Sequence, residues 1–140
     1  MTKLEEYKMF IDGSWVESES KKTFETLNPE NNEPWAKVPE ANSKDVDKAV
    51  KAAQKAFEGE WPKLFPRERG KYLREIANQL RENAEHLGKI ETIDTGKLYK
   101  ETKTQANYIA EYYDYYAGLA DKVEGTVLPI DKNNMQVITT

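Results

Sequence analysis

The stretch RERGKYLREIANQLRENAEHLGKIETIDTGK, residues 67–97, decides the fold class of this 140-residue chain. Its apolar residues recur at spacings of three and four, which places them on one face of a helix rather than on a strand. The members of this face are Leu73, Ile76, Ala77 and Leu80. Pro66 fits the first turn of such a helix, because that turn leaves its N–H groups unbonded in any case. Asn83 can cap a second, shorter helix. Two consecutive helices are therefore predicted.

The end of this stretch, ETIDTGK at residues 91–97, offers a second interpretation. Asp94-Thr95-Gly96 is the tripeptide that presents a catalytic carboxylate in aspartic proteases, where it must follow an apolar strand so that two Asp side chains can share a proton. Here it follows residues with helical spacing. Gly96 stands where a glycine closes a helix. A helix-ending turn is predicted, and a protease loop is not.

The residues before position 40 have strand patterns. Asp12-Gly13 readily forms a tight hairpin turn, so two short strands are predicted within residues 8–17. A second extended pair is predicted at residues 23–27 and 35–38, on either side of a turn rich in Asn and Pro. The first 40 residues are therefore expected to be β-rich.

Two further helices flank the central pair. One begins with Ser43 as its N-cap, and its inward face is predicted to hold Val46, Ala49, Val50, Ala53 and Phe57. The other runs from about Tyr99 to Lys122. Its inward residues are predicted to be Ala106, Ile109, Ala110, Tyr113, Ala117 and Ala120.

From Gly125 the pattern returns to strands, at residues 126–130 and 135–140. A free edge of β-branched residues at a chain end is an aggregation hazard unless another strand covers it. We therefore expect that another chain pairs with this edge or that the natural protein continues past residue 140.

The charge pattern excludes several classes of partner. The 21 Lys and Arg are interspersed with 25 Asp and Glu, which gives a net charge of −4. No face is expected to collect the cations that displace phosphate counterions, so no nucleic-acid partner is predicted. No apolar run approaches the roughly 20 residues that span a bilayer, and the first residues lack the apolar core of a secretory signal. A cytoplasmic protein without a membrane partner is expected.

The inventory of reactive side chains is short. The chain has no Cys, which excludes thiolate metal sites and Cys nucleophiles, and its one His, His86, is predicted to lie on the surface. No GxGxxG or GxxxxGK[ST] motif is present, so no phosphate-cradling loop is expected.

The segment YIAEYYDYYAGLAD, residues 108–121, is rich in tyrosine. A stacking platform for bases or carbohydrate is one interpretation. The tyrosines at 112, 113, 115 and 116 distribute over both faces of a helix, however, and no basic groove accompanies them. Core and interface packing is therefore predicted.

Five segments, in this order, resemble the N-terminal part of the NAD(P)-dependent aldehyde dehydrogenase family. They are FIDGSWV at 10–16, TFETLNPENNEPWAKVPEA at 23–41, DVDKAVKAAQKAFEGEWPKL at 45–64, the stretch at 67–97 and YYAGLADKVEGTVLPID at 115–131. The resemblance implies an α/β fold in which N-terminal β-hairpins, a four-helix layer and a C-terminal β-hairpin arm make up an incomplete domain.

The resemblance implies an oxidoreductase that converts an aldehyde to a carboxylic acid with NAD or NADP. In that family a cysteine thiolate attacks the aldehyde, hydride passes to the nicotinamide, and a glutamate-activated water releases the acid. These groups lie downstream of the region matched here, so no catalytic and no cofactor-binding residue is assigned. The 140-residue chain is expected to need no cofactor and to be inactive alone.

The resemblance also implies a division of the chain. Residues 1–124 would be the N-terminal part of the cofactor-binding domain, and residues 125–140 would begin a β-arm used for oligomerisation. The remaining cofactor-binding and catalytic domains would be absent. A homo-oligomer formed through this arm is implied.

Two candidate sites follow from the resemblance. A monovalent cation would be held by the strand carrying Thr26 and Leu27, through backbone carbonyls, and by the carboxylate of Asp94, all hard oxygen ligands. Tyr108 and Ile109 would border the substrate entrance.

A second hypothesis stays open. The chain could be a stand-alone α+β interaction module that binds a partner, or a related subunit, through its Tyr-rich helix and terminal strand. The coding sequence beyond residue 140 would discriminate between the two hypotheses. Neither hypothesis identifies the aldehyde or chooses between NAD and NADP.

Overall fold

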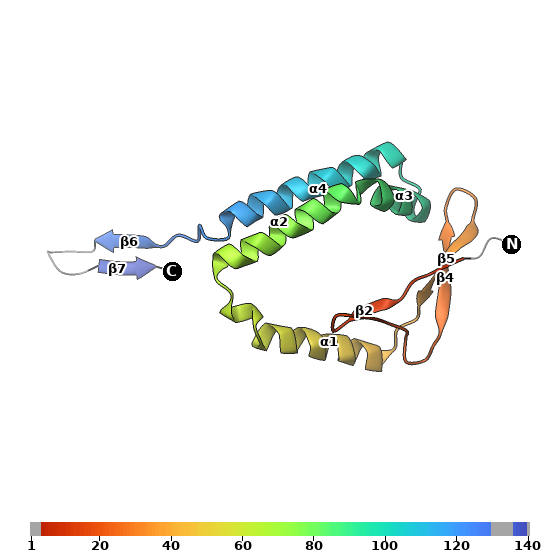
Figure 1. Cartoon of the computed structure of the whole chain (residues 1–140), viewed down its shortest axis with the longest axis horizontal. Helices are drawn as coiled ribbons and strands as arrows, with labels where there is room; N and C mark the ends of the chain where they lie inside the picture. The colour runs from red at the N-terminus through yellow and green to blue at the C-terminus, as the bar shows by residue number, and fades with distance from the viewer. Residues whose placement is uncertain (1–3, 130–135, 140) are drawn as a thin grey trace.

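The computed structural model describes residues 4–129 and 136–139 and shows an α/β arrangement (Figure 1). The elements, in chain order, are β1 (Glu5–Glu6), β2 (Met9–Ile11), β3 (Ser14–Val16), β4 (Thr23–Asn28), β5 (Glu33–Pro39), α1 (Ser43–Glu58), the short 3-10 helix η1 (Trp61–Lys63), α2 (Pro66–Glu82), α3 (Ala84–Thr95), α4 (Tyr99–Leu119), β6 (Thr126–Pro129) and β7 (Gln136–Thr139). The predicted fold class, with β-hairpins, four helices and a closing β-hairpin, is confirmed.

Two small sheets form the N-terminal part. The hairpin β2–β3 turns at Asp12 and Gly13, which both have positive φ, as a two-residue hairpin turn requires. In the other sheet, β5 is central and pairs antiparallel with β4 and parallel with β1. Ala36 of β5 is fully buried there. Both predicted strand pairs are confirmed.

Helices α2, α3 and α4 form a packed layer. Figure 1 shows α2 and α4 side by side along most of their length, with α3 against α4 near the sheet end. Small residues make the contact surface: the buried ones are Gly70, Ala77, Ala84, Gly88, Thr102, Ala106, Ala110 and Ala117. A Cβ on Gly88 would lie 2.9 Å from the Lys103 backbone, which shows how closely α3 approaches α4. The layer therefore closes by near contact of backbones rather than by large side chains.

Thr102 ties α3 to α4 by hydrogen bonds. Its hydroxyl is fully buried and lies 2.9 Å from the Gly88 carbonyl oxygen, 3.0 Å from the Tyr99 carbonyl oxygen and 3.0 Å from the Thr92 hydroxyl. Buried polar groups are kept only when they are bonded in this way.

Helix α1 stands apart from this layer. Its neighbours are chiefly η1 and β2, and it lies across from α2 and α4 in Figure 1. The face predicted to be inward is exposed: the exposed fractions of Val46, Val50 and Phe57 are 55%, 60% and 67%. The prediction of burial is wrong within the described residues, because the apolar spacing is present but no described element covers it.

Three helix boundaries also differ from the predictions. Asn42, not Ser43, caps α1, since its side chain accepts from the N–H groups of Lys44 and Asp45. The Asn83 side chain does not cap α3 and instead donates to the Gln79 carbonyl at 2.8 Å, at the end of α2. Helix α4 ends at Leu119 rather than Lys122.

Strands β6 and β7 form an antiparallel pair, with Thr126 opposite Thr139 and Pro129 opposite Gln136. The pair lies beyond the end of α4, far from the other sheets in Figure 1. The predicted strand residues Ile130, Met135 and Thr140 lie outside the described residues. Among residues 4–129 and 136–139, no helix is both long and apolar enough to cross a bilayer.

Candidate functional site

The end of α3 meets strand β4 at the residues that the sequence singled out for a cation. The Thr26 hydroxyl donates to the Asp94 carboxylate at 2.7 Å, across 68 positions of sequence. Gly96 ends α3 in the left-handed conformation, with φ 74°, and its N–H donates to the Thr92 carbonyl. The tripeptide therefore follows a helix, which confirms the helix-ending turn and speaks against a protease loop.

Strand β4 is irregular beside this contact. The pairing of β4 with β5 shifts register between Thr26 and Leu27, and Leu27 lies opposite Pro34, which has no N–H to donate. Such a bulge disrupts the ladder locally. The shift in register and the Thr26 hydroxyl bond to Asp94 therefore bring an irregular strand segment and an exposed carboxylate to the same corner.

Side chains alone make no metal centre in the described part of the chain. No group of three or more His, Cys, Asp or Glu residues lies close enough together there to hold an ion. His86 is exposed, as predicted, and lines an apolar groove with Tyr72 and Ile76. A cation at Asp94 would therefore depend on backbone carbonyls.

The residues predicted to border a substrate entrance, Tyr108 and Ile109, are both exposed on α4, so the prediction that Ile109 faces inward is wrong. The Tyr108 ring meets the Tyr112 ring edge to face at 5.0 Å between centroids. Core packing is wrong for most of the Tyr-rich segment: Tyr113 is half-buried, but Tyr112, Tyr115 and Tyr116 are exposed. The tyrosine side chains extend outward because Ala residues occupy the positions that face α2 and α3.

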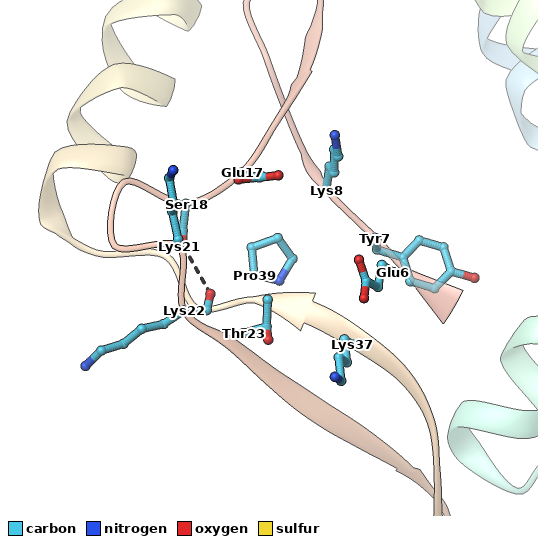
Figure 2. A pocket seen from close by; sticks show the side chains of 10 residues that line it. All are labelled: Glu6, Tyr7, Lys8, Glu17, Ser18, Lys21, Lys22, Thr23, Lys37 and Pro39. Carbon is cyan, nitrogen blue, oxygen red and sulfur yellow. Dashed lines mark hydrogen bonds between the residues drawn. The ribbon is translucent and has the colours of Figure 1, made fainter. Parts of the chain in front are cut away.

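A separate pocket of about 220 Å³ lies at the other end of the β4–β5 ladder, near Thr23 and Pro39 (Figure 2). Lysines from several segments surround it together with Glu6 and Glu17. The Ser18 hydroxyl donates to the Lys22 carbonyl at 3.1 Å and so closes the loop beside the pocket. The Ser18 hydroxyl bonds a backbone carbonyl rather than a basic side chain, which argues against nucleophilic catalysis here.

Tyr7 and Trp35 are enclosed beside this pocket. Their rings meet edge to face at 6.0 Å between centroids. Burial, and then the nearby Glu5 carboxylate, raise the pKa of the Tyr7 phenol. Neither the Tyr7 hydroxyl nor the Trp35 indole N–H makes a hydrogen bond of acceptable geometry with the described residues. They are neutral groups and form part of the packing.

Asp45 is a buried carboxylate that the sequence patterns did not single out. It accepts from the backbone N–H of Asn42 and of Glu19, both at 3.0 Å. The Asn42 N–H lowers the pKa of Asp45 most, and the Glu19 N–H adds to this against the effect of burial. Its role is to fix the start of α1 against the preceding loop. Asn42 with Asp45 three residues later is a capping-box spacing, which could have indicated it.

Comparison with known proteins gives one family. The model of the Aldehyde dehydrogenase family matches residues 15–140. A (Z)-2-((N-methylformamido)methylene)-5-hydroxybutyrolactone dehydrogenase of Acinetobacter baylyi is 42% identical over 134 residues, which are 95% of this chain and 27% of that protein. The betaine aldehyde dehydrogenase of Bacillus subtilis is 41% identical over 133 residues, 93% of this chain and 27% of that protein.

Solved structures agree with the sequence matches. An NAD-dependent aldehyde dehydrogenase from Sinorhizobium meliloti superposes with a TM-score of 0.85 at 32% identity, over 91% of this chain and 26% of that one. A variant of the Staphylococcus aureus betaine aldehyde dehydrogenase, in complex with NAD+, gives 0.81 at 41% identity, over 88% of this chain and 25% of that one. The chain thus spans about a quarter of the length of the relatives it matches.

Proposed function

Because the chain belongs to the aldehyde dehydrogenase family and corresponds to its N-terminal part, we propose that it contributes to an enzyme that oxidises an aldehyde to a carboxylic acid with a nicotinamide cofactor. The observation that carries this proposal is the continuous match of nearly the whole chain, in sequence and in fold, to one part of these enzymes. This match favours the enzyme segment over a stand-alone interaction module.

The proposal assigns the chemical step to residues outside this segment. The sequence has no cysteine to form a thioester and no glycine-rich loop to hold a dinucleotide phosphate. The donor set of the described residues therefore does not fit NAD or NADP by itself. The segment's own contribution would be structural, and turnover by the 140-residue chain alone is not expected.

The exposed face of α1 is where we propose that the rest of the enzyme packs. Val46, Val50 and Phe57 form an apolar stripe that is too continuous to be an ordinary solvent-exposed helix face. Under this proposal residues 1–124 form the N-terminal part of the cofactor-binding domain. Residues 125–140, which include the β6–β7 pair, would begin an arm that joins subunits of a homo-oligomer.

The corner at Asp94 is the proposed monovalent cation site. The bond between Thr26 and Asp94 supports it, as does the register shift at Leu27. A sodium ion would be held by the backbone carbonyls of Thr26 and Leu27 and by the Asp94 carboxylate. Titration of the chain with sodium chloride should broaden the sodium NMR line, and Asp94→Asn should abolish the broadening. Equal line widths for both chains would exclude the site.

Tyr108 and Ile109 are the proposed border of the substrate entrance, since both are exposed on α4 and free to face a pocket built by other segments. The names of the relatives differ in substrate, so the aldehyde is not proposed from similarity. The choice between NAD and NADP and the cytoplasmic location also stay predictions, which assays and fractionation of the longer protein would test.

A chimera tests the proposed function. This chain would replace the matching segment of the Bacillus subtilis betaine aldehyde dehydrogenase, to which it is 41% identical. The chimera should produce reduced nicotinamide from NAD+ and betaine aldehyde, whereas the 140-residue chain alone should not. A second chimera with the Acinetobacter baylyi segment serves as the control. An inactive chimera beside an active control would overturn the proposal.

A further inference from the structure

One exposed stripe of α4 is unusual in composition. Tyr108, Glu111, Tyr112, Tyr115 and Tyr116 line a hollow of about 310 Å³, which we call the tyrosine hollow. These positions are separated by three, four, seven and eight residues from the first, so they share one helix face. That face points away from the α2–α3–α4 contact, which the alanines of α4 make.

The four rings are arranged as two perpendicular pairs. Tyr108 and Tyr112 meet at 5.0 Å and 88°, and their hydroxyls are 3.1 Å apart. Tyr115 and Tyr116 meet at 5.3 Å and 85°. All four side chains are exposed, so ring faces remain open to solvent in each pair. Perpendicular rings present faces in different directions, as the walls of an aromatic cage do.

The α4 segment that forms the hollow carries carboxylates and no basic side chain. Residues 104–121 include Glu111, Asp114 and Asp121 but no Lys or Arg. Asp114 is paired with Arg81, and Asp121 lies next to Lys122, with which it is paired. Glu111 makes no ion pair within the described residues. The one unpaired carboxylate of the stripe therefore lines the hollow.

The Tyr112 phenol stays neutral around neutral pH. The hydrogen bond to Tyr108 raises the pKa of the Tyr112 hydroxyl above its ordinary value of 10.0. Neutral rings keep the negative π faces that attract a cation, and they add no charge to that of Glu111.

We propose that the tyrosine hollow binds an organic cation of the alkylammonium class, with its methyl groups against the tyrosine faces and its charge near the Glu111 carboxylate. A phosphate or nucleic-acid ligand would lack a basic partner here. A neutral apolar ligand would gain contact area but leave the carboxylate without a counter-charge. The hollow shares Tyr108 with the proposed substrate entrance, so the inference rests on the proposed function, but binding of the cation is measured on the described face of α4 without any aldehyde oxidation.

The first experiment compares two ligands of the same shape. Choline is titrated into the 140-residue chain and followed by NMR of the tyrosine ring protons, at an ionic strength held constant with sodium chloride. The uncharged isostere, a dimethylbutanol in which a tert-butyl group replaces trimethylammonium, is titrated in parallel. Choline should bind about ten-fold more tightly, the size expected of a cation over aromatic faces. Equal affinities, or no saturable shift with choline, would overturn the proposal.

Variants then locate the site. Tyr112→Leu should weaken choline binding about ten-fold, Glu111→Gln about three-fold, and Tyr112→Phe less than about two-fold because it keeps the ring. Tyr72→Leu is the matched control, since Tyr72 is an exposed tyrosine on α2 outside the hollow. Equal losses in the Tyr72 and Tyr112 variants would contradict the assignment. If Tyr112→Leu loses its circular dichroism signal, Glu111→Gln and Tyr112→Phe still test the proposal. Choline binding that is unaffected by loss of the Glu111 charge would contradict it.

Discussion

The α2–α3–α4 layer and helix α1 are both amphipathic, but the layer buries the small apolar residues at its helix contacts, whereas the apolar stripe of α1 is exposed. In the layer, glycine and alanine allow backbones to touch, and Thr102 satisfies the carbonyl of Gly88 across the contact. In α1 the larger Val50 and Phe57 are exposed. Small residues therefore close the helix contacts inside this segment, whereas the large apolar residues of α1 stay exposed among the described residues.

A substitution at the contact between α3 and α4 should destabilise the chain most. Gly88→Ala would place a methyl group 2.9 Å from the Lys103 backbone, so α3 and α4 must separate, at a cost of about 3 kcal/mol in the free energy of unfolding. Urea unfolding followed by circular dichroism measures this.

Gly118→Ala is the control for this change, because no atom lies within 4 Å of its added methyl group. It should stabilise the chain by about 0.5 to 1 kcal/mol through helix propensity. A Gly88 variant as stable as the natural chain would refute the close approach of α3 to α4.

Thr102→Val should have the next largest effect. The change removes a buried hydroxyl and leaves the Gly88 carbonyl without that donor, at a cost of about 1 to 2 kcal/mol. Thr104→Val, on the same helix, removes an exposed hydroxyl bonded to the Lys100 carbonyl and should cost about 0.5 kcal/mol at most. Equal midpoints in urea for the two variants would show that the Thr102 network is not part of the closed core.

Asp45→Asn probes a buried carboxylate that anchors the start of α1. The pKa of Asp45 is lowered in the folded state, so its contribution to stability is present above the ordinary carboxyl value of 3.8 and is lost as pH falls through the lower folded value. The natural chain should exceed the variant in urea midpoint at pH 6, and the two midpoints should converge on acidification towards pH 2. A difference that does not change with pH would exclude the linkage.

Substitutions on the exposed apolar stripe of α1 should change the stability of the 140-residue chain least. Val50→Thr with Phe57→Ser should change the unfolding free energy of the 140-residue chain by about 0.5 kcal/mol or less, because both side chains are exposed there. The same pair in the active chimera should lower its melting temperature clearly. A large loss in the short chain would mean that α1 is covered within it, and no loss in the chimera would mean that nothing packs on this face.

The sequence patterns predicted the local structure of each element better than they predicted the contacts between elements. The helical spacing of Ile76 and Ala77 and the Asp12-Gly13 turn are local signals, and the structure confirms both. The same kind of spacing in α1 showed which face is apolar but could not show what covers it. The choice of Asn42 over Ser43 as the cap depended on side-chain reach, since both residue types cap helices well.

The candidate site was predictable only in part. Spacing identified Gly96 as a helix end, but nothing local joins Asp94 to Thr26, because 68 positions separate them. That pairing followed from resemblance to a family. The tyrosine hollow needed the structure, since only the arrangement of alanines against α2 and α3 shows that the rings of Tyr108 and Tyr112 point outward.

The hydrogen bond between Thr26 and Asp94 also closes a long loop of the chain. The path from β4 through α1, η1 and α2 to the end of α3 returns to its starting point at this contact, as the ring in Figure 1 shows. The entropy of bringing such distant ends together grows only slowly with the length between them. Insertions near η1 would therefore weaken this closure little, whereas a chain cut there would lose the benefit of the continuous loop and hold Thr26 against Asp94 less well.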